Sequence, residues 1–330
     1  MRTFSLPGKR SLKLAVAGFL LTTAATGSAF AATPTDAPAA TSPAATSAVQ
    51  APALPSKAPA GALEPTGYWT AEKLRNAIPA DLPNDPKLPA SQDPAPRTGP
   101  PSIASHPVAP VGRTTLNDPV PSTAGKVFFS DNGLNYVCSA AAVNNNYKNL
   151  VVTAGHCIHS GQGGNWHSNI AFAPSYYNGQ SGAGLWNWAA ARTFNAWINN
   201  SNFSYDQAFF TVWPRNNRSL IDTVGGNGLA INNSRSQPGT RIWGWPAEPP
   251  FNGEVPYYCD GTTSASGSTD AALGCTMNGG ASGGPWLKDR IDQNLGYIFA
   301  ATSRRTTSGP QILLATPFNS EVLDMFNQMT

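Results

Sequence analysis

The sequence predicts an all-β domain over residues 121–330, preceded by a long segment that has no core of its own. Within residues 121–330, short apolar runs alternate with turns rich in Gly, Asn, Ser and Pro, which is typical of a β-barrel or a β-sandwich. Nearly all Trp, Tyr and Phe residues lie after residue 127, so only this part of the chain can bury a sizeable core.

The first 32 residues have the three parts of a secretory signal peptide. Lys and Arg residues cluster at the start, residues 14–26 are apolar, and a small-x-small pattern at residues 29–31 predicts cleavage after Ala31 or Ala32. The apolar run is too short for a typical membrane span, which leaves an uncleaved N-terminal anchor as the alternative. We therefore expect a secreted, extracellular protein that is free of the membrane once the signal is removed.

Residues 33–120 are rich in Pro, Ala, Ser and Thr and hold few large apolar groups. Such a segment cannot bury enough surface to offset its ordering entropy, so we expect it to be mostly disordered. Residues 63–78 are the exception, because Tyr68 and Trp69 precede a possible short helix with Thr70 as its N-cap. This piece either docks on the domain or is an isolated apolar stretch in a linker, without a role. A propeptide released near residues 113–123, which would make the chain a zymogen, is favoured over a linker.

From residue 126 the chain reads as a series of short strands. Residues 126–129 and 136–143 are joined by a turn at residues 131–133, and they predict a hairpin. Further strand-like runs lie at residues 150–154, 169–173, 184–194, 208–213, 240–245 and 296–302. Only the end looks helical, with a cap at residues 319–321 followed by one apolar face. That face consists of Val322, Leu323, Phe326 and Met329.

The charge balance excludes a nucleic-acid footprint. The chain has a formal net charge of +3, but residues 121–330 contain 11 Lys and Arg and 11 Asp and Glu, which cancel. No basic patch is therefore expected on the domain, and we expect no nucleic-acid partner.

The stretch Gly279-Gly280-Ala281-Ser282-Gly283-Gly284-Pro285 surrounds one hydroxyl with four glycines. Glycine lets backbone N–H groups crowd around one point, which is what a serine nucleophile needs for an exposed Oγ and an oxyanion site. A glycine-rich surface loop is the alternative for this stretch taken alone.

A second motif, Thr153-Ala154-Gly155-His156-Cys157, follows the apolar run at residues 150–152 and supplies a base. The two motifs in this order resemble the chymotrypsin-like (trypsin-like) serine peptidases, in which His, Asp and Ser follow one another along the chain. The resemblance covers roughly residues 121–330. It implies two six-stranded antiparallel β-barrels with a C-terminal helix.

The base needs an acid that orients it. Asp206 leads directly into the strand-like run at residues 208–213, as the resemblance implies, whereas the rival Asp222 lies in a stretch that suits a surface loop. The resemblance implies that His156 is the base, that Asp206 orients it and that Ser282 is the nucleophile. The N–H groups of Gly280 and Ser282 would bind the oxyanion.

The chain departs from the family pattern beside the nucleophile. Many members have an Asp directly before the serine, which pairs with the new N-terminus after activation; here Ala281 stands there, so other contacts must order the loop. Trypsin-like members have an Asp six residues before the serine. Here Thr276 and Met277 occupy this expected substrate-binding stretch, so specificity for Lys or Arg is not expected.

The strand after the serine has no histidine of the kind that glutamyl endopeptidases use. Thr302 or Ser303 is expected to bond the acid and the substrate backbone. Arg304 and Arg305 follow, and they either meet an acidic substrate residue or form a solvated rim, which is the commoner case.

Four cysteines after a signal peptide imply two disulfides, and the count alone allows three pairings. The resemblance favours Cys138–Cys157 and leaves Cys259–Cys275. The spacing contains no CxxC, so no metal is expected. His159 and His167 lie in a polar loop and are expected at the surface.

The sequence therefore predicts a secreted serine endopeptidase, a hydrolase that carries out proteolysis on protein or peptide substrates, as a monomer and without a cofactor. Two alternatives stay open: a catalytically silent homologue that acts as a binding module, and an esterase on the same scaffold.

Overall fold

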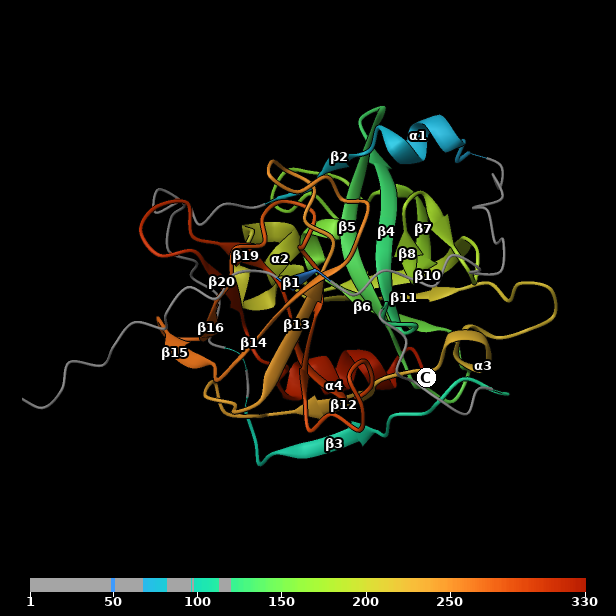
Figure 1. The fold of residues 1–330 in the computed structure, drawn as a ribbon. Coiled ribbons are helices and arrows are strands. Elements are labelled where there is room, and N and C mark those ends of the chain that lie inside the picture. Colours follow the sequence, from blue (N-terminus) through green and yellow to red (C-terminus); the bar gives the residue numbers. More distant parts are fainter. Residues whose placement is uncertain (1–48, 51–67, 82–95, 97, 113–119) are drawn as a thin grey trace, which may run out of the picture. The chain divides into compact units, whose positions relative to one another are not determined.

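The computed structural model of the protein describes residues 49–50, 68–81, 96, 98–112 and 120–330 (Figure 1). The predicted signal peptide lies outside the described residues. So do most of residues 33–120, which the sequence predicts to be disordered, and much of the predicted release region at residues 113–123.

Six antiparallel strands form a closed barrel in the first half of the domain. Their order is β5-β4-β7-β10-β11-β6, and β6 pairs back with β5. The strands are β4 (Ala124–Asp131), β5 (Leu134–Val143), β6 (Leu150–Thr153), β7 (Ser168–Pro174), β10 (Trp186–Thr193) and β11 (Ala208–Val212). Successive side chains of β4 point to opposite faces, so Val127 and Phe129 pack in one apolar cluster and Phe128 in another. This strand is buried on both faces, so its apolar residues 127–129 follow one another without polar residues between them.

The predicted hairpin between β4 and β5 is confirmed. Asp131 faces Leu134 across a two-residue turn, and the turn residues Asn132 and Gly133 both have positive φ, 49° and 81°. Asn and Gly tolerate this left-handed backbone, which matches the twist of the two strands. A short polar turn thus sets the register of the longest strand pair of the barrel.

The second half of the domain contains two sheets. One has the order β1-β14-β13-β17-β18-β12-β3 and the other β15-β16-β20-β19. The first sheet consists of β1 (Val49–Gln50), β3 (Ser102–Ser105), β12 (Gly228–Ile231), β13 (Thr240–Gly244), β14 (Tyr257–Gly261), β17 (Pro285–Lys288) and β18 (Tyr297–Ala301). The second consists of β15 (Ser264–Ser266), β16 (Asp270–Gly274), β19 (Arg304–Arg305) and β20 (Ile312–Ala315). Among the described residues, only the first of the two predicted barrels is closed by its strand pairing.

The predicted C-terminal helix is confirmed as α4 (Ser320–Asn327). The side chain of its N-cap, Asn319, accepts hydrogen bonds from the N–H groups of Glu321 and Val322. Phe326 is buried and its ring lies 6.2 Å from that of Phe209 on β11. The helix thus packs against the first barrel.

Two further helices, α2 (Asn195–Asn200) and α3 (Leu220–Val224), are not predicted from the sequence. Each spans less than two turns, so it shows no helical period. Asn residues dominate the first, which hides it among turn signals.

Part of the leader, residues 68–81, packs on the first barrel. Thr70 caps α1 (Ala71–Arg75) by accepting from the N–H of Lys73, as predicted. Trp69 is 1% exposed, its indole N–H donates to the Asn169 carbonyl (2.6 Å), and its ring lies 5.5 Å from that of Phe128. Of the two alternatives for this piece, the structure therefore favours docking on the domain (Figure 1).

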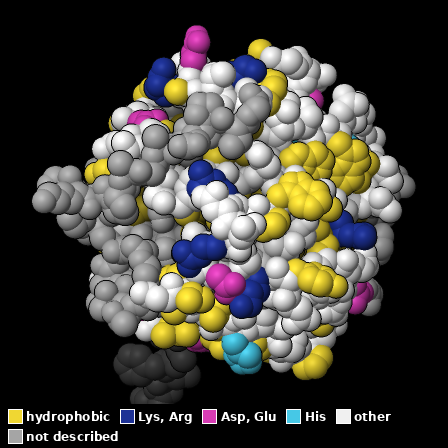
Figure 2. Space-filling view, turned by 90° about the vertical axis from the view of Figure 1, so that its right-hand side faces the viewer, with side chains coloured by type: hydrophobic (Ala, Val, Ile, Leu, Met, Phe, Trp, Pro, Cys, Tyr) yellow, Lys and Arg dark blue, Asp and Glu magenta, His cyan; other side chains and the backbone are white. Residues whose placement is uncertain are grey.

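None of the helices in the described part of the chain has both the length and the hydrophobicity needed to cross a lipid bilayer. On the face drawn in Figure 2, Lys and Arg side chains are interspersed with Asp and Glu among many uncharged groups. This mixture agrees with the balanced charge of residues 121–330.

Candidate active site

His156 and Asp206 form a buried pair at the edge of the first barrel. The Nδ1 atom of His156 lies 2.9 Å from Oδ2 of Asp206, and the backbone N–H of His156 donates to Oδ1 (2.8 Å). The two residues are 6% and 1% exposed. The carboxylate therefore fixes both the position of the imidazole and the nitrogen that carries the proton facing it.

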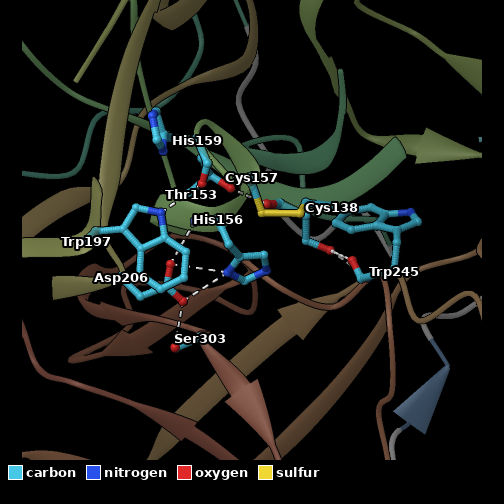
Figure 3. Close-up of a disulfide and its surroundings, with 11 residues drawn as sticks. Cys138, Thr153, His156, Cys157, His159, Trp197, Asp206, Trp245 and Ser303 are labelled. Carbon is cyan, nitrogen blue, oxygen red and sulfur yellow. Dashed lines mark hydrogen bonds and ion pairs between the residues drawn. A yellow bond between two sulfur atoms is a disulfide. The ribbon is translucent and has the colours of Figure 1, made fainter. Parts of the chain in front are cut away.

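Local chain geometry brings this pair together (Figure 3). His156 sits in a single 3-10 turn, Gly155–Cys157, that follows the end of β6 directly. The disulfide Cys138–Cys157 ties this turn to β5. A Cβ atom on Gly155 would stand 3.0 Å from Oδ1 of Asp206, so the absence of a side chain there permits the close approach of the carboxylate.

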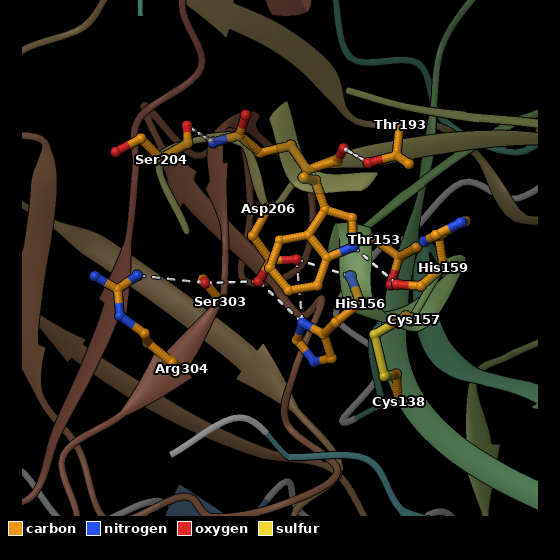
Figure 4. A network of polar contacts seen from close by, with 12 residues as sticks. Cys138, Thr153, His156, Cys157, His159, Thr193, Ser204, Asp206, Ser303 and Arg304 are labelled. Atoms are coloured by element: carbon orange, nitrogen blue, oxygen red, sulfur yellow. Dashed lines mark hydrogen bonds and ion pairs between the residues drawn. A yellow bond between two sulfur atoms is a disulfide. The ribbon is translucent and has the colours of Figure 1, made fainter. Parts of the chain in front are cut away.

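A third donor holds the other side of Asp206. The hydroxyl of Ser303 donates to Oδ2 of Asp206 at 2.6 Å, and Arg304 Nη1 lies 3.5 Å from the same hydroxyl (Figure 4). Thr302 instead accepts from the indole N–H of Trp286 (2.9 Å). Of the two residues expected to bond the acid, Ser303 makes the contact.

The glycine-rich stretch forms a tight loop against the first barrel. Gly283 has φ +80°, its N–H donates to the Thr302 carbonyl, and a Cβ atom there would meet Oγ1 of Thr153 at 2.1 Å. Thr153 ends the strand that leads into His156. Ser282 is thus held beside the segment that carries His156, and it is 3% exposed.

Ser139 orders this loop where many family members use an Asp before the serine. Its hydroxyl donates to the Gly280 carbonyl (2.8 Å) and accepts from the N–H of Trp245 (2.9 Å), and its own N–H donates to the Ser282 carbonyl (2.7 Å). Ala281, which replaces the Asp, is buried. The loop is therefore held by hydrogen bonds from β5.

The other ring nitrogen of His156, Nε2, is buried and has no hydrogen-bond partner among the described residues. A buried polar atom without a hydrogen bond lowers the free energy of unfolding. The Ser282 hydroxyl is the candidate partner, although the structure places no hydrogen bond between the two.

The predicted oxyanion donor Gly280 has φ +97°, and a Cβ atom there would lie 2.6 Å from the Trp245 carbonyl oxygen. Its N–H donates to the carbonyl oxygen of Ala80 in the leader, at 3.3 Å. A carbonyl thus already lies at this donor in the described chain.

The expected solvated Arg pair is wrong for Arg304. This residue is 9% exposed and forms a buried ion pair with Asp270 on β16. Its guanidinium also lies 4.5 Å from the ring centroid of Phe203. An acid on another strand of the same sheet, 34 residues earlier in the sequence, draws the side chain inward. Arg305 instead pairs with Asp81 and Glu248.

The prediction that His159 and His167 lie at the surface is also wrong, since they are 4% and 5% exposed. The His167 ring stacks on Phe129 at 4.2 Å, and burial lowers its pKa to about 4. His159 packs edge-on against Trp166, with ring centroids 5.2 Å apart. Aromatic neighbours cover both rings, although the loop itself is polar.

The remaining predicted residues fall in two groups. Met277 is 2% exposed, and Thr276 is partly buried. The rival acid Asp222 lies in α3, away from His156, where a hydrogen bond from Lys148 lowers its pKa. That ion pair explains Asp222 as a surface contact.

Ligand atoms of Cys138, His156 and Cys157 lie within 4.8 Å of one another. Both sulfurs are bound in the disulfide and cannot act as thiolate ligands. The second disulfide joins Cys259 and Cys275, the pairing that the resemblance leaves.

Sequence reasoning missed three participants: Ser139, Ala80 and Glu248. Ser139 follows Cys138, so its position beside the predicted disulfide was a usable signal. Nothing in the composition marks Ala80 or Glu248.

No family model and no curated protein matches the chain. Solved structures do. The thermostable serine protease AL20 from an extremophilic microorganism is 33% identical, with a TM-score of 0.60, over 63% of this chain and 97% of that one. The protease Anisep from Arthrobacter nicotinovorans is 32% identical, with a TM-score of 0.59, over 63% and 95%. A Glu endopeptidase, at 18% identity and a TM-score of 0.53 over 69% and 98%, shares the fold. The arrangement of the site and the extent of these matches show that the chain belongs to the chymotrypsin-like serine protease family.

Proposed function

We propose that this protein is a secreted serine endopeptidase that works through Ser282, His156 and Asp206. The observation that carries the proposal is the buried His156–Asp206 pair. The other ring nitrogen of His156, Nε2, has no hydrogen-bond partner among the described residues. The turn that holds His156 lies next to the Ser282 loop. A base oriented on one nitrogen and unoccupied on the other is what an acyl-transfer site requires.

In the proposed reaction, His156 takes the proton of the Ser282 hydroxyl as Oγ attacks the scissile carbonyl carbon. Asp206 holds the imidazole in its tautomer and stabilises the imidazolium that forms. The proton then passes from His156 to the leaving amine, and a covalent acyl-enzyme remains. Water activated by the same imidazole releases the acid and restores the hydroxyl.

The N–H groups of Gly280 and Ser282 are the proposed oxyanion donors. The positive φ of Gly280 turns its peptide into the loop, and Ser139 fixes the carbonyl on the other side of that residue. Donors fixed in advance stabilise the charge that develops in the transition state without reorganisation.

We propose that this chain also has the finer features of the family. The two sheets of the second half correspond to the second barrel of the fold, and residues 1–32 direct secretion. Residues 33–120 form a propeptide, and Thr276, Met277, Thr302 and Ser303 border the substrate. AL20 and Anisep are named as proteases, which supports peptide bonds as the substrate class.

Hydrolysis by the processed protein tests the proposal. Casein and a simple ester are offered to the parent, to Ser282→Ala and to Ser266→Ala, a matched serine on β15. We expect casein cleavage by the parent and by Ser266→Ala, and a loss of about 10⁴-fold or more in Ser282→Ala. Ester hydrolysis without casein cleavage would indicate an esterase, and no hydrolysis of either substrate would indicate a silent binding module.

A further inference from the structure

Leader residues 78–81 connect the first barrel to the Ser282 loop. The strand β2 (Ile78–Pro79) pairs in parallel with β5 at Tyr136 and Val137, and the N–H of Ala80 donates to the Val137 carbonyl at 2.9 Å. The segment is thus held on β5 by backbone hydrogen bonds, one residue before the disulfide that anchors the His156 turn.

The carbonyl of Ala80 lies at the proposed oxyanion donor. Gly280 N–H donates to it at 3.3 Å. Because one N–H group binds one carbonyl at a time in good geometry, a substrate carbonyl at Gly280 must displace Ala80. The leader and a substrate would therefore compete for the N–H group of Gly280.

The next residue, Asp81, is held by an ion pair. Arg305 Nε donates to Asp81 Oδ2 at 2.8 Å, and Arg305 Nη2 lies 2.7 Å from the same oxygen. The side chains are 12% and 26% exposed, so solvent screens this pair less than an open surface pair. Glu248 binds the same guanidinium at 3.0 Å and holds its plane.

The loop before Ser282 makes room for these carboxylates. A Cβ atom on Gly279 would lie 2.6 Å from Glu248 Oε1 and 3.1 Å from Asp81 Cβ. A side chain at this position would push both acids away from Arg305. The absence of a side chain at Gly279 thus leaves room for both carboxylates beside Arg305.

The anchor upstream makes this occupancy intramolecular. Trp69 and Leu74 are 1% and 3% exposed on the barrel, and Asp81 follows only a few residues later. A short tether of this kind keeps the segment at a high effective concentration next to the site.

We propose that residues 78–81 occupy the substrate site of the unprocessed chain, and that Arg305 is a subsite for an acidic peptide side chain, which Asp81 fills. The proposal rests on the proposed function. The two neighbouring arginines have different roles in this proposal. Arg304 pairs with Asp270 inside the fold, whereas Arg305 pairs with Asp81 of the leader. Arginine suits this role because its planar fork binds a carboxylate through several N–H groups.

The test measures how fast a fluorophosphonate labels Ser282 in the chain that still holds its leader, as verified by intact mass. Asp81→Asn removes the charge and keeps the shape. Asp260→Asn is the matched control, because Asp260 also pairs with an arginine, Arg241 on β13. We expect labelling to be about fivefold faster or more in Asp81→Asn, the effect of losing one ion pair, and unchanged in Asp260→Asn.

Arg305→Gln removes the same pair from its other side and is expected to speed labelling by a similar factor. The double variant Asp81→Asn/Arg305→Gln should be no faster than either single variant, since all three lose the same Asp81–Arg305 pair, the one that holds the leader. Equal labelling in the parent, Asp81→Asn and Arg305→Gln would overturn the inference and leave the proposed function standing. Absence of a Ser282 adduct in every variant, and in the processed protein as well, would overturn both.

The preference of Arg305 for an acidic side chain is tested in the Asp81→Asn chain with two blocked tetrapeptides. One has the sequence of residues 78–81, and the other ends in asparagine. We expect the acidic peptide to slow labelling at a severalfold lower concentration than the amide peptide, and this difference to vanish in Asp81→Asn/Arg305→Gln. Equal inhibition by the two peptides in Asp81→Asn would show that Arg305 does not select acidic side chains.

Discussion

Asp206 shows how much of this site depends on single contacts. Its carboxylate accepts from the His156 backbone N–H and the Ser303 hydroxyl and faces His156 Nδ1. Three partners on one buried carboxylate leave it little freedom to rotate, so the imidazole has one favoured orientation. The orientation of the His156 ring is therefore set by Asp206 and, through it, by Ser303.

Ser303→Ala removes one of these partners and should lower kcat about tenfold, because a hydrogen bond to a charged group is lost. Ser303 acts here as a positioning residue, through Asp206. Peptide hydrolysis under saturating substrate measures the effect, with Ser266→Ala as the control. A kcat equal to that of the parent would contradict the role of Ser303.

Lys126 supplies a prediction about pH. It lies on β4, donates to the Gly253 carbonyl (3.1 Å), and burial lowers its pKa from 10.5 to about 8, against the attraction of Glu254. Between these two values the unfolded chain binds more protons than the folded chain, so stability rises with pH across the window. Below pH 8 the full cost of the buried charge is present.

The comparison with Lys126→Met isolates this effect from other titrating groups. From pH 7 to pH 10, the parent should gain about 2 kcal/mol in free energy of unfolding relative to the variant. Denaturant unfolding at the two pH values measures it. A difference between the two proteins that stays constant with pH would rule out the lowered pKa.

At the scale of elements, the Ser282 loop takes its shape from β5. Ser139 satisfies the Gly280 carbonyl, the Ser282 carbonyl and the Trp245 N–H at one point of the strand. The same strand carries Cys138, whose disulfide fixes the His156 turn. One strand thus positions both motifs that are far apart in sequence.

Ser139→Ala leaves a buried carbonyl and a buried N–H without this partner. We expect a loss of about 1–3 kcal/mol in free energy of unfolding, together with slower peptide hydrolysis. Ser130→Ala is the control, since Ser130 lies on the neighbouring strand β4 and its hydroxyl bonds to Ser168 and Asn169 of β7, away from the Ser282 loop. Parent-like unfolding and hydrolysis by Ser139→Ala would show that the loop is ordered without it.

Some elements of the fold could be predicted from local sequence signals, and others could not. The hairpin at residues 131–133 and the capped helix α4 follow from local signals, and these were predicted correctly. The strand β17 was missed because it begins at Pro285, directly after the glycines that read as a loop. Arg304 was misjudged because its partner Asp270 lies in another strand, a contact that no local pattern encodes.

At the scale of the molecule, each half of the domain carries one disulfide. The bridges span 19 and 16 residues, so their effects on the unfolded chain should be similar, about 3 kcal/mol each. Their positions differ. Cys138–Cys157 joins β5 to the His156 turn, whereas Cys259–Cys275 joins β14 to the end of β16.

Replacing either pair with alanine should therefore lower the melting temperature by a similar amount. At a temperature where both variants stay folded, we expect Cys138→Ala/Cys157→Ala to lose peptide hydrolysis and Cys259→Ala/Cys275→Ala to keep it. Calorimetry and hydrolysis on the same preparations check both parts. Equal activity in the two variants would show that the first bridge has no special role in placing His156.

In the described part of the leader, two side chains make the contacts that matter here. The buried indole of Trp69 docks the segment on the barrel, and Asp81 pairs with Arg305. From the sequence, this region reads as a low-complexity segment with an isolated aromatic pair. Its course along β5 depends on pairing with residues 136 and 137, which the barrel brings into place only after folding.

Mapping the fluorophosphonate adduct on the processed protein tests directly whether Ser282 is the nucleophile and His156 its base. We predict a single adduct on Ser282, formed rapidly in the parent and abolished in His156→Ala. An adduct on another residue, or labelling of Ser282 at the parent's rate in His156→Ala, would contradict it.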